Sequence, residues 1–570
     1  MPLDLVIRSG TVIDGTGAAP RTADVAIAGG HIVEVGSVRA KGRREIDADG
    51  ALVAPGFVDI HTHYDGQATW DERLQPSSGH GVTTVVSGNC GVGFAPVRPD
   101  DRETLVELME GVEDLPGTVL HEGLSWEWET IADYLDALER RHYDIDIAAQ
   151  VCHGPVRLYV MGQRGADRAP ASPEEITEMG RLAAEGIRAG ALGFTTSRTL
   201  NHRTSRGEPT PTLTAAREEL VGIARTIGET GRGVLQVVSD FTDRDAEGET
   251  LLEMMRASGR PLSISLLQAA PGLGYRSRLD LLDTAQAEGL AMRAQVAARA
   301  VGVLVGLQGS INPLSRTPSY RAVAELPVAD QARILSDTDC RRRLLAEVKE
   351  KRLPFSLEHM FELGDPPDYE PEPESSILAR ARQTGVDADD LFIDLLLADE
   401  GRALLYVPFL NYFDGNLDAA AEMIAHPHTV PGLSDGGAHV GTICDASFPT
   451  SLLTHWGRDR GRGTTFSLPF LIHGQSRATA EAVGLLDRGM LAPGYKADVN
   501  VIDFENLALT PPRMVHDLPA GGKRLVQGAR GYLHTIVSGV ETYADGRATG
   551  SLPGRFVRGE KPQPRQETSP

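Results

Sequence analysis

Short apolar runs alternate with longer amphipathic segments through the middle of the chain, and this alternation predicts βα units. The apolar runs lack polar alternation, as expected for parallel strands that are covered on both faces. The first is Phe57–Ile60, which follows Pro55 and Gly56. The other expected strands are 81–87, 146–151, 191–195, 234–238, 262–266, 292–296 and a last short strand that ends near Asp435. Eight such strands predict an α/β chain with a (β/α)8 TIM barrel.

Two of the intervening segments carry clear helix signals. The apolar positions of 173–189 recur at helical spacing, with Ser172 as the expected N-cap and Glu175 three residues further on. The segment 215–230 is the second expected helix. Both follow a predicted strand, as a barrel requires.

The two ends of the chain have a different pattern. Short β-type runs separated by Gly and Asp occur near the N-terminus and again after the predicted barrel, and neither end has enough strands for a stable sheet alone. We therefore expect the termini to form one small β-sandwich domain from residues 1–50 and 485–558, with the barrel domain at 51–484. The Pro-rich polar tail 559–570 is expected to be disordered.

The segment at about 301–428 is too long for a loop and is expected to be an insertion over the barrel mouth, where it could act as a lid. Its expected elements are helices at 337–350 and 387–398, strands at 355–358 and 403–408, and an exposed Pro-rich acidic loop at 364–374.

Composition narrows the possible partners. The 570 residues are 41% hydrophobic and 24% charged, and 79 acidic against 56 basic residues give a formal charge of −23. This charge opposes binding to nucleic acids and anionic membranes. The N-terminus has no signal-peptide pattern and no segment is long enough to span a membrane, so we expect a cytoplasmic protein without nucleic-acid or membrane partners. The composition is compatible with assembly into a homo-oligomer. Four cysteines in so long a chain predict free thiols rather than a disulfide framework.

The first predicted strand ends in His61-Thr62-His63. Residues i and i+2 of a strand point the same way, so both imidazoles project into one space. Functional residues of parallel barrels lie at the carboxyl ends of the strands, and these histidines are at that end. The pair therefore predicts a site for a divalent metal.

Four sequence motifs resemble one enzyme family. Ala-Pro-Gly-Phe-Val-Asp-Ile-His-Thr-His-Tyr-Asp at 54–65 resembles the first-strand signature of the amidohydrolase superfamily, whose members are metal-dependent hydrolases on a (β/α)8 barrel. Ser-Gly-Asn-Cys-Gly at 87–91, Ser-Asp-Gly at 434–436 and Met-Val-His-Asp-Leu-Pro-Ala-Gly-Gly at 514–522 resemble the D-aminoacylase branch, the N-acyl-D-amino-acid deacylases. The likeness runs through nearly the whole chain.

The resemblance implies roles for two further residues. Asp435 matches the aspartate at the end of the eighth strand that binds metal and takes a proton from the attacking water. Cys90 matches a cysteine of the metal site, and a thiolate binds zinc strongly. The implied ligands are therefore His61, His63, Cys90 and Asp435, with Asp435 also catalytic.

The chain departs from the branch at three places. The branch has histidines at the ends of strands five and six, where this chain has Val238 and either Leu266 or Leu267. Aliphatic side chains cannot bind a metal, so we expect a single Zn²⁺ rather than two metals. A His-Pro-Arg that helps to hold the substrate carboxylate is also absent, and Gly441–Asp445 stands there.

Other polar residues near predicted strand ends are candidates for substrate binding, although such residues are more often simply loop or surface residues, and for His153 the two interpretations are balanced. A guanidinium could hold an anionic group of the substrate through two hydrogen bonds. The candidates are His153, Arg198, Gln236, Gln268 and Arg299, with His202 beside Arg198. Four other histidines are interpreted as structural: His359, His426, His428 and His439.

Three functions agree with these observations. The first is a metal-dependent hydrolase that acts on C–N bonds other than peptide bonds and cleaves a linear amide, most like an N-acyl-D-amino-acid deacylase. The second keeps the barrel but takes a cyclic amide or imide. The third is a catalytically silent binding protein, since a fold does not guarantee activity.

Overall fold

The structure is a computed structural model that describes residues 2–272 and 274–565. It is an α/β fold with several sheets, two of which are parallel throughout. One parallel sheet has the order β6-β7-β8 and the other β17-β13-β12-β11-β10-β9. The strands are β6 (Phe57–Asp59), β7 (Val82–Ser87), β8 (Asp146–Ala149), β9 (Val151–Cys152), β10 (Gly193–Arg198), β11 (Val234–Ser239), β12 (Leu262–Leu266), β13 (Met292–Val296) and β17 (Thr429–Pro431).

These strands occur close to where the apolar runs predict them. The bounds of β12 and β13 are as predicted, and the expected strand 146–151 is interrupted at Gln150, which separates β8 from β9. The last strand, β17, ends before Asp435. Its extension stops because Leu433 and Asp435 have positive φ angles, 59° and 50°, so the backbone leaves the extended region there.

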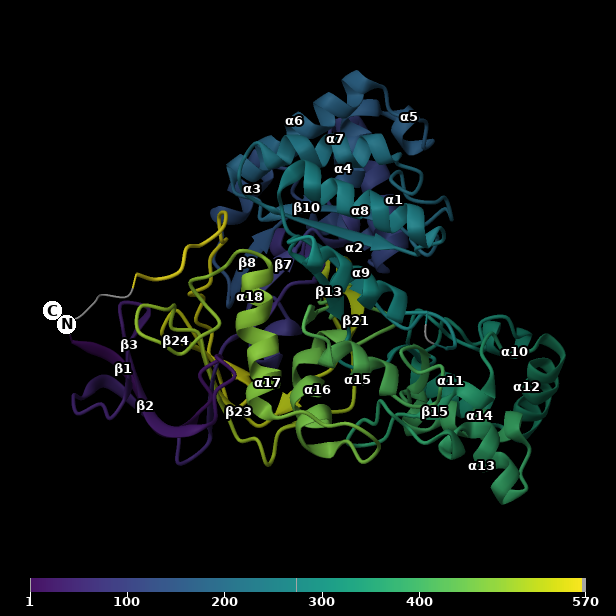
Figure 1. Ribbon diagram of the computed structural model, residues 1–570. Helices are drawn as coiled ribbons and strands as arrows, with labels where there is room; N and C mark the ends of the chain where they lie inside the picture. The colour runs from purple at the N-terminus through teal and green to yellow at the C-terminus, as the bar shows by residue number, and fades with distance from the viewer. Residues whose placement is uncertain (1, 273, 566–570) are drawn as a thin grey trace.

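Helices follow most of the parallel strands and form the upper part of Figure 1. In α6 (Pro173–Ala189), which has the predicted bounds, Ser172 Oγ accepts from the Glu175 backbone at 3.2 Å and the Glu175 carboxylate accepts from the Ser172 backbone at 2.7 Å. This capping box satisfies two backbone donors at the start of the helix. The other helices in this part of the chain are α1 (Arg102–Glu113), α2 (Gly117–Gly123), α3 (Ile131–Glu139), α4 (His153–Met161), α5 (Gln163–Ala166), α7 (Arg217–Gly228), α8 (Arg244–Ser258) and α9 (Arg276–Ala287).

The segment between β13 and β17 builds a lobe of its own, at the lower right of Figure 1, around a separate apolar core that includes Leu344 and Phe392. The expected strand at 355–358 is wrong. Ser356 accepts from the Glu358 backbone and starts a 3-10 turn instead. The elements are β14 (Val301–Val305), α10 (Pro318–Arg321), α11 (Val328–Leu335), α12 (Thr338–Lys351), β15 (Phe361–Glu362), α13 (Ile377–Thr384), α14 (Ala388–Leu397), β16 (Leu405–Leu410) and α15 (Asp418–Ala425).

The acidic loop 364–374 is less exposed than expected. Tyr369 is buried, and Glu370 is buried against Arg460 and His455, with contacts of 2.9–3.0 Å. The Arg460 guanidinium is a cationic partner, which explains why an acidic residue of this loop lies in the interior.

Both ends of the chain contribute to one nine-stranded sheet, because β18 (Val499–Ile502) pairs with β5 (Leu52–Pro55). Figure 1 accordingly shows the first strands beside β24. The other strands of this sheet are β1 (Leu3–Val12), β2 (Arg21–Ala28), β3 (His31–Gly36), β4 (Gly42–Asp47), β23 (Tyr532–Val537), β24 (Val540–Ala544) and β25 (Arg547–Ala548).

Residues 559–565 do not behave as the expected disordered tail. The backbone of Lys561 donates to Gly484 O and accepts from Leu486 N, both at 2.9 Å, which fixes this segment against the body of the protein. Residues 566–570 lie outside the described residues. Between β17 and this segment lie α16 (Phe448–Thr454), α17 (Leu468–His473), α18 (Thr479–Ala482), β19 (Ala508–Leu509), β20 (Arg513–Leu518), β21 (Gly522–Val526) and β22 (Ala529–Arg530).

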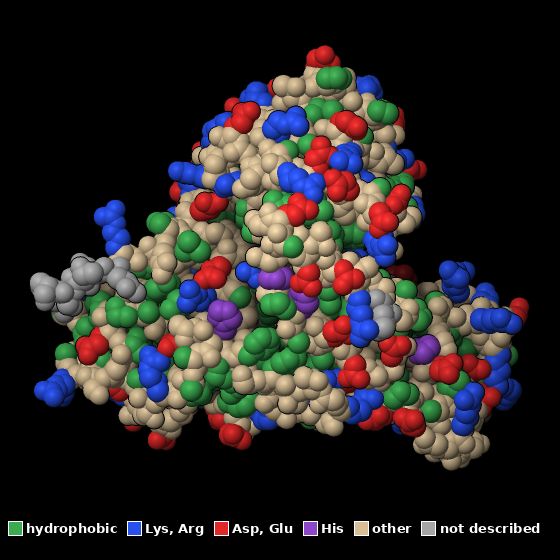
Figure 2. Space-filling model, in the orientation of Figure 1, with side chains coloured by type: hydrophobic (Ala, Val, Ile, Leu, Met, Phe, Trp, Pro, Cys, Tyr) green, Lys and Arg blue, Asp and Glu red, His purple; other side chains and the backbone are tan. Residues whose placement is uncertain are grey.

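Within the described parts of the chain, no helix is both long and apolar enough to cross a bilayer. On the face in Figure 2, basic and acidic side chains are intermixed, and several histidines gather near its centre.

Candidate metal centre

The histidine pair follows β6 at the carboxyl end of the parallel sheet. Thr62, between the two histidines, forms a parallel bridge with Gly436 after β17. Both imidazoles are only 1% exposed, and their ring centroids are 5.5 Å apart. Two buried imidazoles at this spacing can bind one ion.

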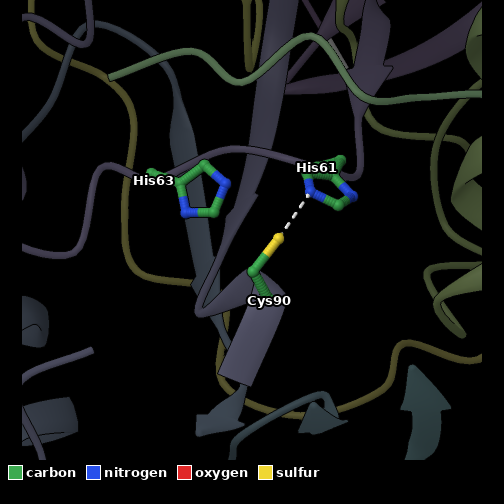
Figure 3. A group of neighbouring side chains, drawn as sticks. All are labelled: His61, His63 and Cys90. Atoms are coloured by element: carbon green, nitrogen blue, oxygen red, sulfur yellow. Dashed lines mark hydrogen bonds between the residues drawn. The ribbon is translucent and has the colours of Figure 1, made fainter. Parts of the chain in front are cut away.

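Cys90 lies between the two rings in Figure 3. It follows β7 in the left-handed backbone region (φ 56°), and Sγ is 3.4 Å from His61 Nε2. One donor atom from each of His61, His63 and Cys90 lies within 4.8 Å of the other two. The structure thus brings together three of the four residues that the resemblance implies as ligands.

Asp435 is the fourth. Its Oδ1 is 3.4 Å from His61 Nε2 and 3.6 Å from His63 Nε2, and its side chain is 20% exposed. Burial raises the pKa of Asp435, but the three neighbouring histidines, including His439, outweigh that effect and hold it below its usual value. The carboxylate is therefore ionised at neutral pH and is the most accessible of the four groups.

Two glutamines that contact His61 Nδ1 orient its ring. Gln295 Oε1 lies 2.6 Å from Nδ1, and Gln236 Nε2 lies 3.0 Å from it. The Gln295 carbonyl can only accept, so it favours a proton on Nδ1 and leaves the lone pair of Nε2 facing Cys90 and Asp435; a protonated Nδ1 cannot also accept from Gln236 Nε2, which then only packs against it. Burial lowers the pKa of His61 to about 4 against the opposing effect of Asp435, so the imidazole is neutral, as a metal ligand must be.

His63 has a charged partner that sequence reasoning missed. Glu113, the last residue of α1, is 1% exposed, and its Oε1 lies 3.2 Å from His63 Nδ1. Its Oε2 lies 3.7 Å from His439 Nε2. Burial lowers the pKa of His63, but Glu113, followed by Asp435 and Cys90, outweighs it and holds that pKa well above its usual value.

Glu113 does not belong to a sequence motif, but an acidic residue at the C-terminal end of a helix is unusual. Negative charge at a helix C-terminus opposes the helix dipole, and burial of a carboxylate costs further free energy. A glutamate and an aspartate stand together at the end of α1, as Glu113 and Asp114. Residues that break a local stability rule are candidates for a functional role.

The donor set fits a soft divalent cation. Imidazole and thiol groups suit zinc better than Mg²⁺. Neither ring nitrogen of His63 meets hydrogen-bond geometry with a described residue, although both are buried. Burial raises the pKa of the Cys90 thiol to about 12, so binding of an ion there would release a proton.

The resemblance implies further histidines at the ends of β11 and β12, where Val238 and either Leu266 or Leu267 offer no ligand atom. Side chains two residues apart in a strand share a face, so Val238 faces the same side as Gln236. On β12, Ser263 accepts from Gln295 Nε2 at 3.0 Å, which places Ser265 and Leu267 on the inner side by the same alternation. The Ser265 hydroxyl is buried without a hydrogen-bond partner among residues 2–272 and 274–565.

The two candidate arginines are held by internal partners. Arg198 Nε contacts both carboxylate oxygens of Glu247, at 2.8 and 3.1 Å. Arg299, 1% exposed, contacts Asp445 Oδ1 at 3.1 Å, and its guanidinium carbon is 3.4 Å from the ring centroid of Tyr369. Arg299 is thus buried with its partners, whereas the paired Arg198 side chain is 20% exposed.

His153 and Gln268 have internal partners too. The two ring nitrogens of His153 contact Thr196 Oγ1 at 2.9 Å and Glu219 Oε1 at 3.0 Å. Gln268 Nε2 donates to Asp414 Oδ2 at 2.8 Å. Among the five candidates for substrate binding, Gln236 contacts a residue of the histidine pair.

Two histidines that are not part of the predicted ligand set lie near the centre. His439, interpreted as structural from the sequence, reaches Glu113 and is 32% exposed. His202 Nδ1 contacts Ser197 Oγ at 2.8 Å, and burial, followed by the charge of His439, lowers its pKa to about 3. His426 and His428 instead contact Asp283 at the surface.

Comparison with known proteins identifies the family. The model of the Amidohydrolase family matches residues 44–360 and 378–543. D-aminoacylase of Alcaligenes xylosoxydans xylosoxydans is 32% identical over 297 residues, which is 50% of this chain and 55% of that protein. N-acyl-D-glutamate deacylase of the same organism is 34% identical over 260 residues, 45% of this chain and 48% of that protein. The matches thus span about half the length of these relatives.

A solved structure extends the likeness to the whole fold. N-acyl-D-glutamate deacylase from Bordetella bronchiseptica, in complex with zinc and a phosphonate inhibitor, superposes with a TM-score of 0.64 at 24% identity. The superposition covers 98% of this chain and 100% of that one.

Proposed function

The chain belongs to the amidohydrolase family, and from that premise we propose that it is a metal-dependent hydrolase of a non-peptide amide C–N bond. The observation that carries the proposal is the convergence of His61 Nε2, Cys90 Sγ and His63 within 4.8 Å, beside the Asp435 carboxylate. An acylase reaction consumes one water and yields a carboxylic acid and an amine.

We infer that the parallel strands close into a (β/α)8 barrel around this centre. The two parallel sheets are consecutive in the chain across Gln150, and the Thr62–Gly436 bridge joins the first strand to the segment after the last. On this view 51–484 is the catalytic domain with the 301–428 lobe inserted, and 1–50 with 485–558 forms the accessory β domain, in which the nine-stranded sheet would be one layer.

The proposed ligands are His61, His63, Cys90 and Asp435, holding one zinc ion. An ion there would supply Lewis acidity, polarising the substrate carbonyl and lowering the pKa of a water molecule. Val238 and Leu267 offer no donor for a second ion. A catalytic zinc site leaves one coordination position to water or substrate, so one of the four groups would bind the ion most weakly. The more exposed Asp435 suits that role.

Asp435 is the proposed general base. As an ionised carboxylate it can accept the proton of the attacking water and donate it to the nitrogen of the departing amine. This transfer needs an acceptor close to the ligands but open to the substrate, which its partial exposure provides.

Glu113 and Gln295 are proposed as positioning residues. Each contacts the Nδ1 atom of one histidine and so turns its Nε2 toward the common space. Partners of this kind fix the tautomer and ring orientation of metal-bound histidines. Gln236 would support the same imidazole as Gln295.

The substrate class is taken from the relatives. D-aminoacylase and N-acyl-D-glutamate deacylase favour a linear N-acyl amide. A cyclic amide or imide is the second candidate, because the changed ends of β11 and β12 give this chain an inner surface with Val238 and Ser265 in the place of ligands. A silent binding protein is the third.

One experiment separates these functions. Purified protein loaded with zinc is incubated with N-acetyl-D- and N-acetyl-L-amino acids, N-alkylacetamides and dihydrouracil, and the release of acid or amine is measured. Hydrolysis of a linear amide supports the proposal. Hydrolysis of the cyclic compound alone favours the second candidate, and a protein that binds no zinc and hydrolyses nothing contradicts the proposal.

A further inference from the structure

The charges that surround the Asp435 carboxylate are unusual for a site that would hold an acidic substrate. Glu113 lies behind His63, and Asp445, 3% exposed, lines a cavity of about 20 Å³ together with Asp435. Burial raises the pKa of Asp445 to about 7, although Arg299 opposes this. Beyond the histidines that contact Asp435, two further carboxyl groups thus stand near the centre, one behind His63 and one in the cavity lining.

The arginine of that cavity is also occupied. Arg524 lines it, but its Nε and Nη2 contact the Asp517 carboxylate at 2.8 and 2.9 Å. Its Nη1 donates to Gln75 O at 2.9 Å. The Arg524 side chain is 4% exposed, so little of it can meet a ligand.

Arg299 is also held, through its Nη1 and Nη2 atoms. Besides Asp445, its Nη1 donates to Ser447 and Ser451 at 2.9 and 2.8 Å. Its Nη2 also donates to the Cys444 carbonyl at 3.2 Å. To bind a substrate carboxylate, Arg299 would have to give up a buried ion pair, which is strongly unfavourable.

Two further basic groups near the site are imidazoles. His439 contacts Glu113, and His202 is kept neutral by burial and by its histidine neighbours. Neither Arg524 nor Arg299 can therefore pair with an anion without losing a carboxylate partner.

We propose that this site takes amides that carry no free carboxylate beside the scissile bond, that is, neutral or cationic N-acyl amines. The proposal rests on the amidohydrolase function proposed above and specifies its substrate class. It separates this chain from relatives whose names specify N-acylated acidic amino acids. A substrate carboxylate about 6 Å from the ionised Asp435, without a cationic partner of its own, would bind about 100-fold more weakly at an effective dielectric constant of about 20.

The test compares two substrates that differ only in this charge. N-acetyl-D-alanine and N-acetyl-D-alaninamide are incubated with the zinc-loaded protein, and acetate release gives kcat/KM for each. We expect the alaninamide to be preferred about 100-fold. An equal rate, or a preference for the acid, would overturn the proposal.

A binding measurement keeps the test independent of turnover. Acetohydroxamic acid and the monohydroxamate of succinic acid, which bears a carboxylate, are titrated calorimetrically into the zinc-loaded protein. We expect the neutral hydroxamate to bind more tightly. If it does, but neither amide is hydrolysed, the charge selectivity stands and the proposed hydrolase function fails.

The variant Asp445→Asn probes the cause of the selectivity. It removes one carboxyl group and the carboxylate partner of Arg299. The ratio of kcat/KM for the alaninamide to that for the acid should therefore fall about 10-fold or more. Ser447→Ala, which removes a neutral partner of Arg299 but no charge, is the matched control. An unchanged ratio in a folded Asp445→Asn protein would contradict the electrostatic explanation.

Discussion

Replacement of Asp435 by asparagine tests the proposed proton transfer with little change in shape. The position has φ 50°, a conformation that asparagine and aspartate tolerate better than other residues with a side chain. The amide oxygen can still face His61 and His63, at the 3.4 and 3.6 Å of the carboxylate oxygen. We therefore expect a loss of stability of only about 1 kcal/mol.

The expected loss of activity is much larger. A neutral amide cannot accept the proton of the attacking water, and general acid–base catalysis contributes about 10²- to 10⁴-fold in rate. This corresponds to about 2.7–5.5 kcal/mol in the activation barrier. The two magnitudes do not overlap, so loss of catalysis can be distinguished from loss of folding.

The assay measures kcat, zinc content and thermal unfolding on the same preparation, because Asp435 is also a proposed ligand. Asp399→Asn is a matched control, since Asp399 has the same φ of 50° and lies exposed in the inserted lobe, paired with Arg402. A rate within a factor of about three of the parent, with normal zinc, would refute the assignment of Asp435 as the base. His439, which is partly exposed at the same site, would then be tested next.

Three further predictions concern the ligands, their support and the pH dependence of stability. His61→Ala and His63→Ala should each lose zinc and activity while circular dichroism shows an intact fold; full zinc in either variant would mean that the pair is misassigned. Glu113→Gln should weaken zinc binding about 10- to 100-fold in competition with a chelator, as loss of a carboxylate behind a metal-bound histidine does; unchanged affinity would contradict its positioning role. Glu370 has a pKa of about 2 because its two basic partners outweigh burial, so its contribution to stability is complete above the ordinary value of 4.5 and is lost as the pH falls toward 2. Glu370→Gln should therefore flatten the dependence of Tm on pH in this window, and parallel curves for parent and variant would count against the assignment.

The strands and most helices could be predicted from the sequence because their information is local. The bounds of β12, β13 and α6 follow from apolar runs and a capping box. Similarly, His61 and His63 are two residues apart on one strand. Their meeting with Cys90 needed only the rule that parallel strands present their carboxyl ends at one edge.

The surroundings of the candidate centre could not be predicted in this way. Glu113 contacts His63 from the end of a helix 50 residues away, and Gln295 contacts His61 across 234 residues. Neither belongs to a motif. The pair of Arg299 and Asp445 is separated by 146 residues, so the sequence could suggest a cation at the mouth but not that a buried carboxyl group already holds it.

The tail and the acidic loop show a second limit. Residues 559–565 are polar and Pro-rich, yet backbone hydrogen bonds hold them to the chain around Gly484. These bonds cannot be predicted from composition. Glu370 is buried because Arg460 approaches from 90 residues away. Composition predicts exposure only where no long-range partner exists.

The central claim is that His61, His63, Cys90 and Asp435 hold a single zinc ion that is required for amide hydrolysis. Its most direct test is elemental analysis of the purified protein, with acetate release from N-acetyl amides measured before chelation, after chelation and after titration with zinc. We predict about one zinc per chain, activity that is lost with the metal, and full recovery at one equivalent. Two tightly held equivalents would contradict the single-ion site, and a protein that binds no zinc and gains no activity from it would contradict the account as a whole.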